Sequence, residues 1–352
     1  MKISQLFIAS AVIILLMNSC ENGNPVYPDN AYQTVYFANQ YPIRTVELGE
    51  DLFVDNSMDN LHQVKILATM GGTQNNTKDR VIGYVVDTTL CNSLYYSTFS
   101  PSTTLGTVGS TVRPMPSNYY TLSPSNSITI PAGSVMGGVT VQLTDAFFAD
   151  PSSLTTTYVI PLVMKTSDDS ILSGKPVVDS PSIFVASNWS ILPKDYVLYA
   201  VKYVNPWQAN YLRRGIDQIT KADGTVSTNT RHKQYVESDD VVKISTGSLN
   251  VANLALTIKD SAGKDVAYTV VLTFADDGSC TVGSNSTNFE ITGTGKFVSK
   301  GEKNSFGGKD RSAIYLDYSV NFKSLSWKYV TKDTLVVRDR GLVAEYYTVI
   351  KK

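Results

Sequence analysis

The most specific chemistry in the sequence belongs to Cys20, because a cysteine in this position can be acylated. The preceding residues 1–19 have a charged start, an apolar run from Leu6 to Met17 and a small residue before the cysteine, which is the order of a secretory signal. A cysteine directly after the cleavage point is typical of a bacterial lipoprotein. The apolar run is too short to cross a hydrocarbon layer of roughly 30 Å, which argues against a transmembrane anchor. We therefore expect residues 1–19 to be removed and residues 20–30 to form a lipidated tether.

A second group of side chains, around Trp207, is suited to binding sugar. Asn205-Pro206-Trp207-Gln208 is turn-like and leads into Tyr211-Leu212-Arg213-Arg214. An aromatic ring on a rigid turn can stack on the apolar face of a sugar, while amide and guanidinium groups bond its hydroxyls. The candidate carbohydrate-binding residues are Trp207, Asn205, Tyr211, Arg213 and Arg214. The alternative is that the tryptophan plugs the end of a barrel and that the arginines pair with local acids.

Motifs for other chemistry are absent from the sequence. His62 and His232 are the only histidines, and neither lies in a zinc-binding or Ser-His-Asp pattern. Phosphate-binding and dinucleotide-binding glycine loops are also missing. We therefore predict no catalytic residue, no metal and no cofactor. A glycoside hydrolase needs only two carboxylates, but the acids suited by type are interpreted as surface or turn residues; they are Asp239, Asp240, Asp317 and Asp339.

Charge and cysteine usage limit the partners and indicate two domains. The net charge is −7 over residues 21–180 and +5 over residues 181–352, which predicts a domain boundary near residue 180. Neither half has the Lys/Arg tract of a nucleic-acid binder, so nucleic acid is excluded as a partner. Cys91 and Cys280 fall in different predicted domains, and we expect both to be unpaired.

The chain reads as all-β, with many Thr, Ser and Val residues and 21 tyrosines. Strict alternation is clearest from Ile314 to Phe322, where every second residue is apolar. Short strands separated by turn residues predict an immunoglobulin-like sandwich over residues 31–175 and a linker over residues 176–193. Successive hairpins over residues 194–352 predict an antiparallel barrel, lipocalin-like, with a second sandwich as the alternative.

Several motifs resemble a known family of outer-membrane lipoproteins of Bacteroidetes, which are associated with polysaccharide-utilisation systems. In the first half they are Val35-Tyr36-Phe37, Lys78-Asp79-Arg80, Asn118-Tyr119-Tyr120-Thr121-Leu122, Ile130-Pro131-Ala132-Gly133 and Tyr158-Val159-Ile160-Pro161-Leu162. In the second half they are Lys202-Tyr203-Val204-Asn205, Tyr211-Leu212-Arg213-Arg214-Gly215 and the run from Asp333 to Gly341. The resemblance pairs an N-terminal domain of unknown function with an uncharacterised C-terminal domain. It provides no catalytic residue to carry over.

The resemblance implies a cell-surface glycan-binding lipoprotein that works beside an outer-membrane transporter and its hydrolases. Surface-displayed members carry several acids after the lipidated cysteine, whereas here only Glu21 is acidic, so attachment facing the periplasm is the alternative. We expect a non-catalytic protein that binds oligosaccharide mainly through its C-terminal domain. An adhesin or fimbria-like subunit is the alternative function, and a glycoside hydrolase is a third.

Overall fold

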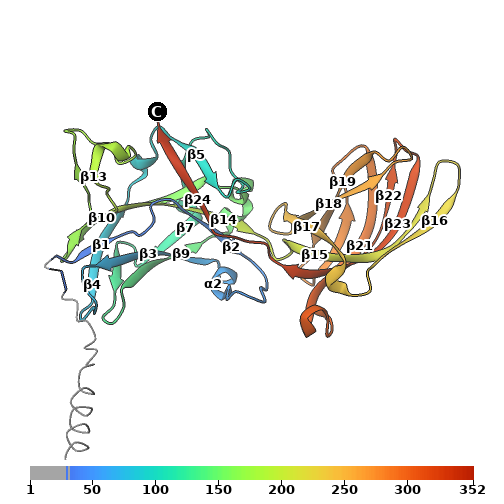
Figure 1. Cartoon of the computed structure of the whole chain (residues 1–352), viewed down its shortest axis with the longest axis horizontal. Helices are drawn as coiled ribbons and strands as arrows, with labels where there is room; N and C mark the ends of the chain where they lie inside the picture. Colours follow the sequence, from blue (N-terminus) through green and yellow to red (C-terminus); the bar gives the residue numbers. More distant parts are fainter. Residues whose placement is uncertain (1–28, 31) are drawn as a thin grey trace, which may run out of the picture.

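The computed structural model describes residues 29–30 and 32–352, and it is almost entirely β (Figure 1). Cys20, the predicted signal and most of the predicted tether lie outside the described residues. Two β-rich units lie side by side along the long axis, and the C-terminus returns to the unit that contains the first strands (Figure 1). The predicted all-β class, with a sandwich and a closed barrel, is confirmed.

The first unit is a sandwich of two sheets. One sheet has the order β11 (Ser170–Ile171), β1 (Thr34–Tyr36), β3 (Gln63–Gly71), β9 (Met136–Leu143), β7 (Tyr120–Ser123). The other has the order β5 (Leu94–Ser100), β24 (Glu345–Lys351), β2 (Pro42–Glu47), β14 (Tyr196–Val204), β10 (Tyr158–Ser167), β4 (Arg80–Val86), β8 (Ser127–Ile130), with β6 (Arg113–Pro114) beside β10. Its short helices are α2 (Ser57–Asn60), α3 (Asp145–Ala149) and the 3-10 turns η1 (Thr88–Cys91), η2 (Ser117–Tyr119), η3 (Pro151–Leu154) and η4 (Ala186–Asn188).

The second unit is a closed antiparallel barrel of eight strands. They are β15 (Ala209–Thr220), β17 (Asp240–Thr246), β18 (Val251–Lys259), β19 (Asp265–Phe274), β20 (Ser279–Gly283), β21 (Phe289–Glu302), β22 (Arg311–Phe322) and β23 (Trp327–Asp339). Pairing of β15 with β23 closes the barrel, and β16 (Val226–Arg231) extends from β15. The unit also contains the 3-10 turns η5 (Val236–Ser238) and η6 (Phe306–Gly308).

Side-chain alternation builds the barrel core as the sequence predicts. On β22 the five apolar residues at alternate positions from Ile314 to Phe322 are buried and belong to one core cluster. Asp260 and Asp277 form the expected hairpin turns, because their carboxylates accept backbone N–H groups two residues further along the chain. Cys91 and Cys280 are buried and unpaired, as expected.

The barrel is inserted into the sandwich rather than following it. β14 pairs with β10 and with β2, and β24 pairs with β2 and β5, so both strands belong to the sandwich. This differs from the boundary at residue 194 expected from the sequence. All nine residues of β14 are buried, and a strand covered on both faces has no alternation to show which sheet it joins. The expected linker over residues 176–193 contains most of a small hairpin of β12 (Lys175–Pro176) and β13 (Trp189–Ile191).

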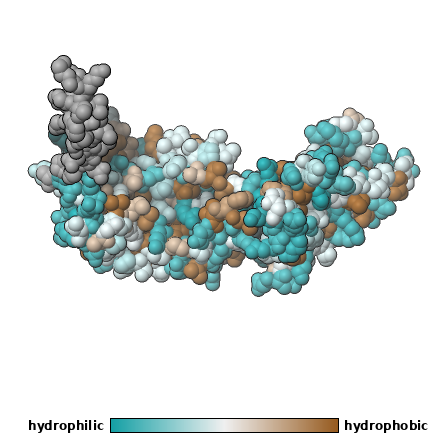
Figure 2. All heavy atoms as spheres, turned by 60° about the horizontal axis from the view of Figure 1, so that its bottom comes forward, coloured by the Kyte–Doolittle hydropathy of each residue, from teal (hydrophilic) through white to brown (hydrophobic). Residues whose placement is uncertain are grey.

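The surface view shows where apolar side chains gather. Hydrophobic positions cluster on the sandwich and around the middle of the molecule, with hydrophilic positions beside them (Figure 2). Across the part of the chain that the structure describes, none of the helices has the length and apolar character needed to span a bilayer.

Candidate functional site

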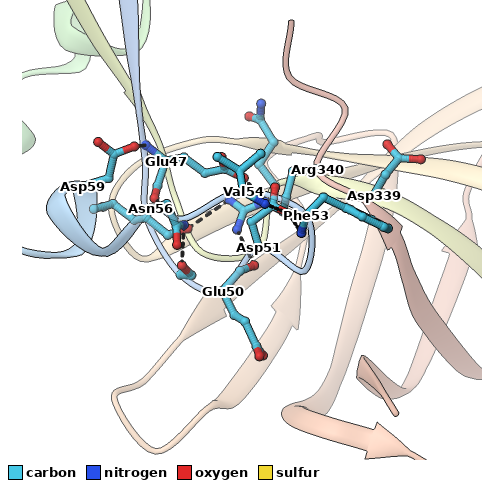
Figure 3. Close-up of polar contacts among 12 residues, drawn as sticks. Glu47, Glu50, Asp51, Phe53, Val54, Asn56, Asp59, Asp339 and Arg340 are labelled. Atoms are coloured by element: carbon cyan, nitrogen blue, oxygen red, sulfur yellow. Dashed lines mark hydrogen bonds and ion pairs between the residues drawn. The ribbon is translucent and has the colours of Figure 1, made fainter. Parts of the chain in front are cut away.

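A buried arginine joins the two units where the chain passes between them. Arg340 lies between β23 and β24, and its Nη2 donates to the carbonyl oxygens of Leu48 and Asn205, each at 2.9 Å. Its Nη1 donates to the carbonyl oxygen of Glu50 at 3.2 Å, and its Nε lies 3.3 Å from Glu47 Oε1. Figure 3 shows this guanidinium beside the loop that follows β2. One side chain therefore ties a sandwich loop to both connecting segments, and we call this set of contacts the junction clamp.

The carboxyl group of Glu47 is poised to titrate inside the junction clamp. Burial raises its pKa to about 7, Arg340 opposes this increase, and nearby Asp51 and Asp59 raise the pKa further. Asp59 is also buried, accepts the Glu47 backbone N–H at 2.9 Å and pairs with Arg44 at 2.5 Å. The clamp thus places a titratable acid beside a permanent cation.

The loop of residues 48–56 packs against the barrel without leaving room for a ligand. Asn56 Nδ2 holds the loop by donating to the carbonyl oxygens of Glu47 and Gly49. Between this loop and the barrel, beside Phe53, the remaining cavity is about 20 Å³, which is about one water molecule. This part of the interface is a packing contact.

A larger hollow lies nearby, and we call it the junction groove. Its volume is about 490 Å³, within the range of about 300–1,000 Å³ typical of ligand sites. The sandwich contributes residues that follow β2 and residues at the end of α2 or just after it. The connection between the units contributes Pro206 and Trp207, and strands and turns of the barrel contribute the rest. The residues that matter here are Asn60, His62, Trp207, Leu249, Asn250 and Asp276.

Trp207 is the rigid element of the junction groove. Its ring stacks on Phe274 with centroids 3.9 Å apart and an angle of 7° between the planes. Its backbone N–H donates to Asn205 Oδ1 at 3.2 Å, and the side chain is only partly buried. Stacking on one side and a fixed turn on the other leave few rotamers for the indole, so the surface it presents to the groove is preorganised.

The other predicted sugar-binding residues support Trp207 or lie elsewhere. Asn205 is fully buried and its Nδ2 donates to the carbonyl oxygens of Ser248 and Val251. Tyr211 is fully buried and its hydroxyl donates to the carbonyl oxygen of Trp207 at 2.7 Å. Both side chains hold the turn and have no surface to offer a ligand, which corrects the expectation that they would contact sugar.

Arg213 and Arg214 are not part of the junction groove. They are consecutive on β15, and side chains alternate between the faces of a strand. Arg213 therefore points into the barrel and binds Asp333 at 2.9 Å, whereas Arg214 binds Asp239 at 2.6 Å. For these two residues the structure agrees with the alternative of pairing with local acids.

The barrel interior holds a neutral network of two arginines and two aspartates. Arg231 binds Asp217 at 2.8 Å and Asp333 at 2.7 Å, and Asp333 also binds Arg213 and accepts from the hydroxyl of Tyr318. Burial would raise the pKa of Asp217, but the hydrogen bonds and charge of Arg231, with a hydrogen bond from Thr331 and the charge of Arg213, together lower it. The network neutralises its own charges inside the barrel.

The acids that suited a glycoside hydrolase by type do not form a pair in one cleft. Asp239 is paired with Arg214, Asp317 is exposed on the outer wall of the barrel, and Asp339 accepts from Asn210. The described residues contain no cluster of His, Cys, Asp or Glu side chains arranged to hold a metal ion.

Several residues of the junction groove carry no local sequence signal. Asn60 and His62 come from the sandwich, and Leu249 and Asn250 come from a barrel turn far along the chain. For Asp276 the sequence indicates a turn but gives no sign of a binding role. These side chains meet because the barrel is inserted beside β2, and that arrangement depends on long-range pairing.

The fold and groove define a two-unit, all-β protein in which a barrel is inserted into a sandwich. A family model described as a domain of unknown function, DUF5627, matches residues 206–341, which is the inserted barrel. A second model, described as an N-terminal domain, matches residues 28–171 of the sandwich. A solved Bacteroides ovatus protein of unknown function is 54% identical, with a TM-score of 0.84, over 92% of this chain and 100% of that chain. The chain belongs to the family of that Bacteroides ovatus protein.

More distant structures are similar only in part. A Bacteroides ovatus multidomain protein including DUF1735 is 15% identical with a TM-score of 0.42, over 88% of this chain and 97% of that chain. An auxiliary nutrient binding protein from Bacteroides thetaiotaomicron is 14% identical with a TM-score of 0.35, over 88% of this chain and 92% of that chain. At these scores neither structure bears on the function of this chain. Among curated proteins, no relative matches it.

Proposed function

We propose that this protein is a non-catalytic, lipid-anchored glycan-binding protein whose junction groove takes an oligosaccharide. The observation that carries the proposal is a rigid indole, stacked on Phe274, at the side of a groove of about 490 Å³. A flat aromatic surface held in one orientation suits the apolar face of a sugar ring. Of the five candidate residues suggested by the sequence, we assign direct contact with the sugar to Trp207 alone.

The polar groups of the junction groove suit sugar hydroxyls. Asn60 and Asn250 each offer an amide donor and acceptor, Asp276 offers a carboxylate acceptor, and His62 offers both functions at its ring. Sugar hydroxyl groups both donate and accept hydrogen bonds. A groove that offers both donors and acceptors can therefore pair with them fully. Because both units contribute, binding in the groove would depend on the junction clamp.

Anchoring is the second part of the proposal. Acylation of Cys20 would attach the protein to the outer membrane, with the groove held away from the bilayer by the sandwich and the tether. Many copies on one surface would offset weak binding by each groove. A position beside an outer-membrane transporter, facing the cell exterior or the periplasm, would then concentrate oligosaccharide for uptake.

A panel of neutral glycans, screened on the soluble chain that begins at Glu21, identifies a ligand, and titration calorimetry with that ligand tests the junction groove. Replacing Trp207 with alanine is expected to weaken binding at least about tenfold, or about 1.4 kcal/mol. The matched control is Tyr235→Ala, since Tyr235 is an aromatic residue 59% exposed that does not line the groove. Absence of any ligand in the panel, or equal affinity of the Trp207 variant and the wild type, would reject the proposal.

A further inference from the structure

A second hollow lies on the outer wall of the barrel, and we call it the wall groove. It crosses β15, β23, β22 and β21 and has a volume of about 590 Å³. Register places Thr334, Tyr315 and Lys296 side by side in one row across three strands. The next outward row places Lys332, Asp317 and Thr294 side by side in the same way. The surface is mostly polar around one aromatic ring, with the exposed Ile216 beside Lys332 at its β15 end.

Two glycines let the strands of the wall approach closely at this point. Between the two outward rows runs an inward row in which Gly215 pairs with Asp333, Asp333 with Leu316, and Leu316 with Gly295. A Cβ atom on Gly215 would lie 2.1 Å from the Lys332 carbonyl oxygen, and one on Gly295 would lie 2.6 Å from that of Tyr315. Only glycine allows the strands to approach so closely, so the hollow is built into the barrel.

The aromatic ring in the wall groove is fixed. Tyr315 is half-buried, and its hydroxyl donates to Glu302 Oε1 at 2.7 Å. With the hydroxyl already engaged, the ring is left as a platform. Thr294 and Thr334 on the neighbouring strands add hydroxyl groups at the same level of the groove.

The solvent-facing side chains of the wall groove carry more positive than negative charge. Lys296 and Lys332 both line the groove, and both are exposed. The one carboxylate in the groove lining that faces solvent is Asp317, which lies 3.3 Å from Lys332 Nζ. An anionic ligand would therefore meet two cations. It would compete with Asp317 for Lys332, and Lys296 also interacts electrostatically with Asp277 in the adjacent turn.

We propose that the wall groove is a second saccharide site, distinct from the junction groove, and that it takes a saccharide carrying a carboxylate or a sulfate. A sugar ring stacks on Tyr315, the threonine hydroxyls bond its hydroxyls, and the two ammonium groups bind its anionic substituent. The site lies wholly on the barrel, so it operates whether or not the junction groove binds glycan.

Calorimetry at low salt with three hexasaccharides tests this proposal on the soluble chain from Glu21. The probes are an oligogalacturonide, which carries carboxylates, its neutral methyl ester, and a carrageenan oligosaccharide, which carries sulfates. Binding of either anionic probe, with loss of binding to the methyl ester, is the expected result. The double variant Lys296→Gln with Lys332→Gln is expected to weaken that binding at least about tenfold, and Asp317→Asn to strengthen it.

Matched variants distinguish binding in the wall groove from non-specific attraction of an anion to the protein and from binding in the junction groove. The control Lys259→Gln with Lys264→Gln removes the same charge from two exposed lysines elsewhere on the barrel and is expected to leave affinity unchanged. The Trp207→Ala variant is expected to keep its affinity for the anionic probe. The proposal is overturned if neither anionic probe binds, if both lysine pairs give equal losses, or if the Trp207 variant no longer binds.

Discussion

The replacement of Arg340 by alanine should open the junction between the two units. The wild-type guanidinium donates to three backbone carbonyl oxygens, those of Leu48, Glu50 and Asn205, and lies beside the Glu47 carboxylate. Alanine removes every one of these contacts. The side chain is 4% exposed in the wild type, so water does not replace these contacts without rearrangement of the loop.

The expected loss of unfolding free energy depends on the buried groups that lose their partner when Arg340 is removed. Breaking a buried ion pair by removing one partner costs about 3–5 kcal/mol, because an uncompensated charge remains. Carbonyl oxygens left without a donor cost about 1–3 kcal/mol. We therefore expect a loss of unfolding free energy of about 3–5 kcal/mol when Glu47 is charged, and of about 1–3 kcal/mol when it is neutral.

The pH dependence identifies Glu47 as the source of the difference. Its pKa in the folded protein is about 7, above the ordinary value of 4.5. A raised acid pKa favours the folded state below the ordinary pKa, and this contribution is lost as the pH rises through the folded value. Removing Arg340, which opposes the increase, raises the pKa further. The loss caused by the alanine variant should thus be larger at pH 8 than at pH 5.

Urea unfolding of the wild type and the Arg340→Ala variant at pH 5 and pH 8 measures the loss of unfolding free energy and its dependence on pH. The added substitution Glu47→Gln should recover stability of the alanine variant at pH 8 and change it little at pH 5. A loss below about 1 kcal/mol would refute the junction clamp, since typical exposed pairs contribute that little. Equal losses at the two pH values would refute the role given to Glu47.

Four other outcomes are expected. Tyr347→Ala should lower the unfolding free energy by about 3–5 kcal/mol in urea, because its buried ring fixes the final strand in the sandwich. The barrel expressed alone as residues 206–341 should unfold cooperatively on heating, as followed by circular dichroism, because the two ends of this segment lie close together and its hydrophobic core contains only barrel residues. Asp333→Asn should cost about 3–5 kcal/mol, whereas Asp317→Asn on the exposed wall should cost less than about 1 kcal/mol, as compared by thermal unfolding. Cys20→Ser should abolish labelling by radioactive palmitate and move the protein out of the membrane fraction; labelling that persists in the variant, or is absent from the wild type, would reject acylation of Cys20.

Local pattern was enough to predict most strands and the barrel, but not how the chain divides between the units. Alternation from Ile314 to Phe322 and the aspartate turns are properties of neighbouring residues, so they can be read directly. The pairing of Ile43 with Glu345 joins residues about 300 positions apart and has no local signature. The insertion of the barrel follows from such pairs, and the sequence could not reveal it.

The candidate binding residues also divide into those that local sequence could indicate and those that depend on the fold. Trp207 could be found because a tryptophan on a Pro-containing turn is a local feature. Asn205 and Tyr211 are close to it in sequence, but their side chains satisfy backbone groups of the turn. His62 belongs to the other unit and joins the junction groove only after folding. Lipidation, membrane location, a transporter partner and the adhesin and hydrolase alternatives stay predictions.

The most direct test of the central claim is a crystal structure of the protein with the neutral oligosaccharide that binds most tightly in the panel. We predict electron density for a sugar ring in the junction groove, in contact with the Trp207 indole and within hydrogen-bond distance of Asn60 or Asn250. Density for that oligosaccharide elsewhere, with the junction groove unoccupied, would contradict the account.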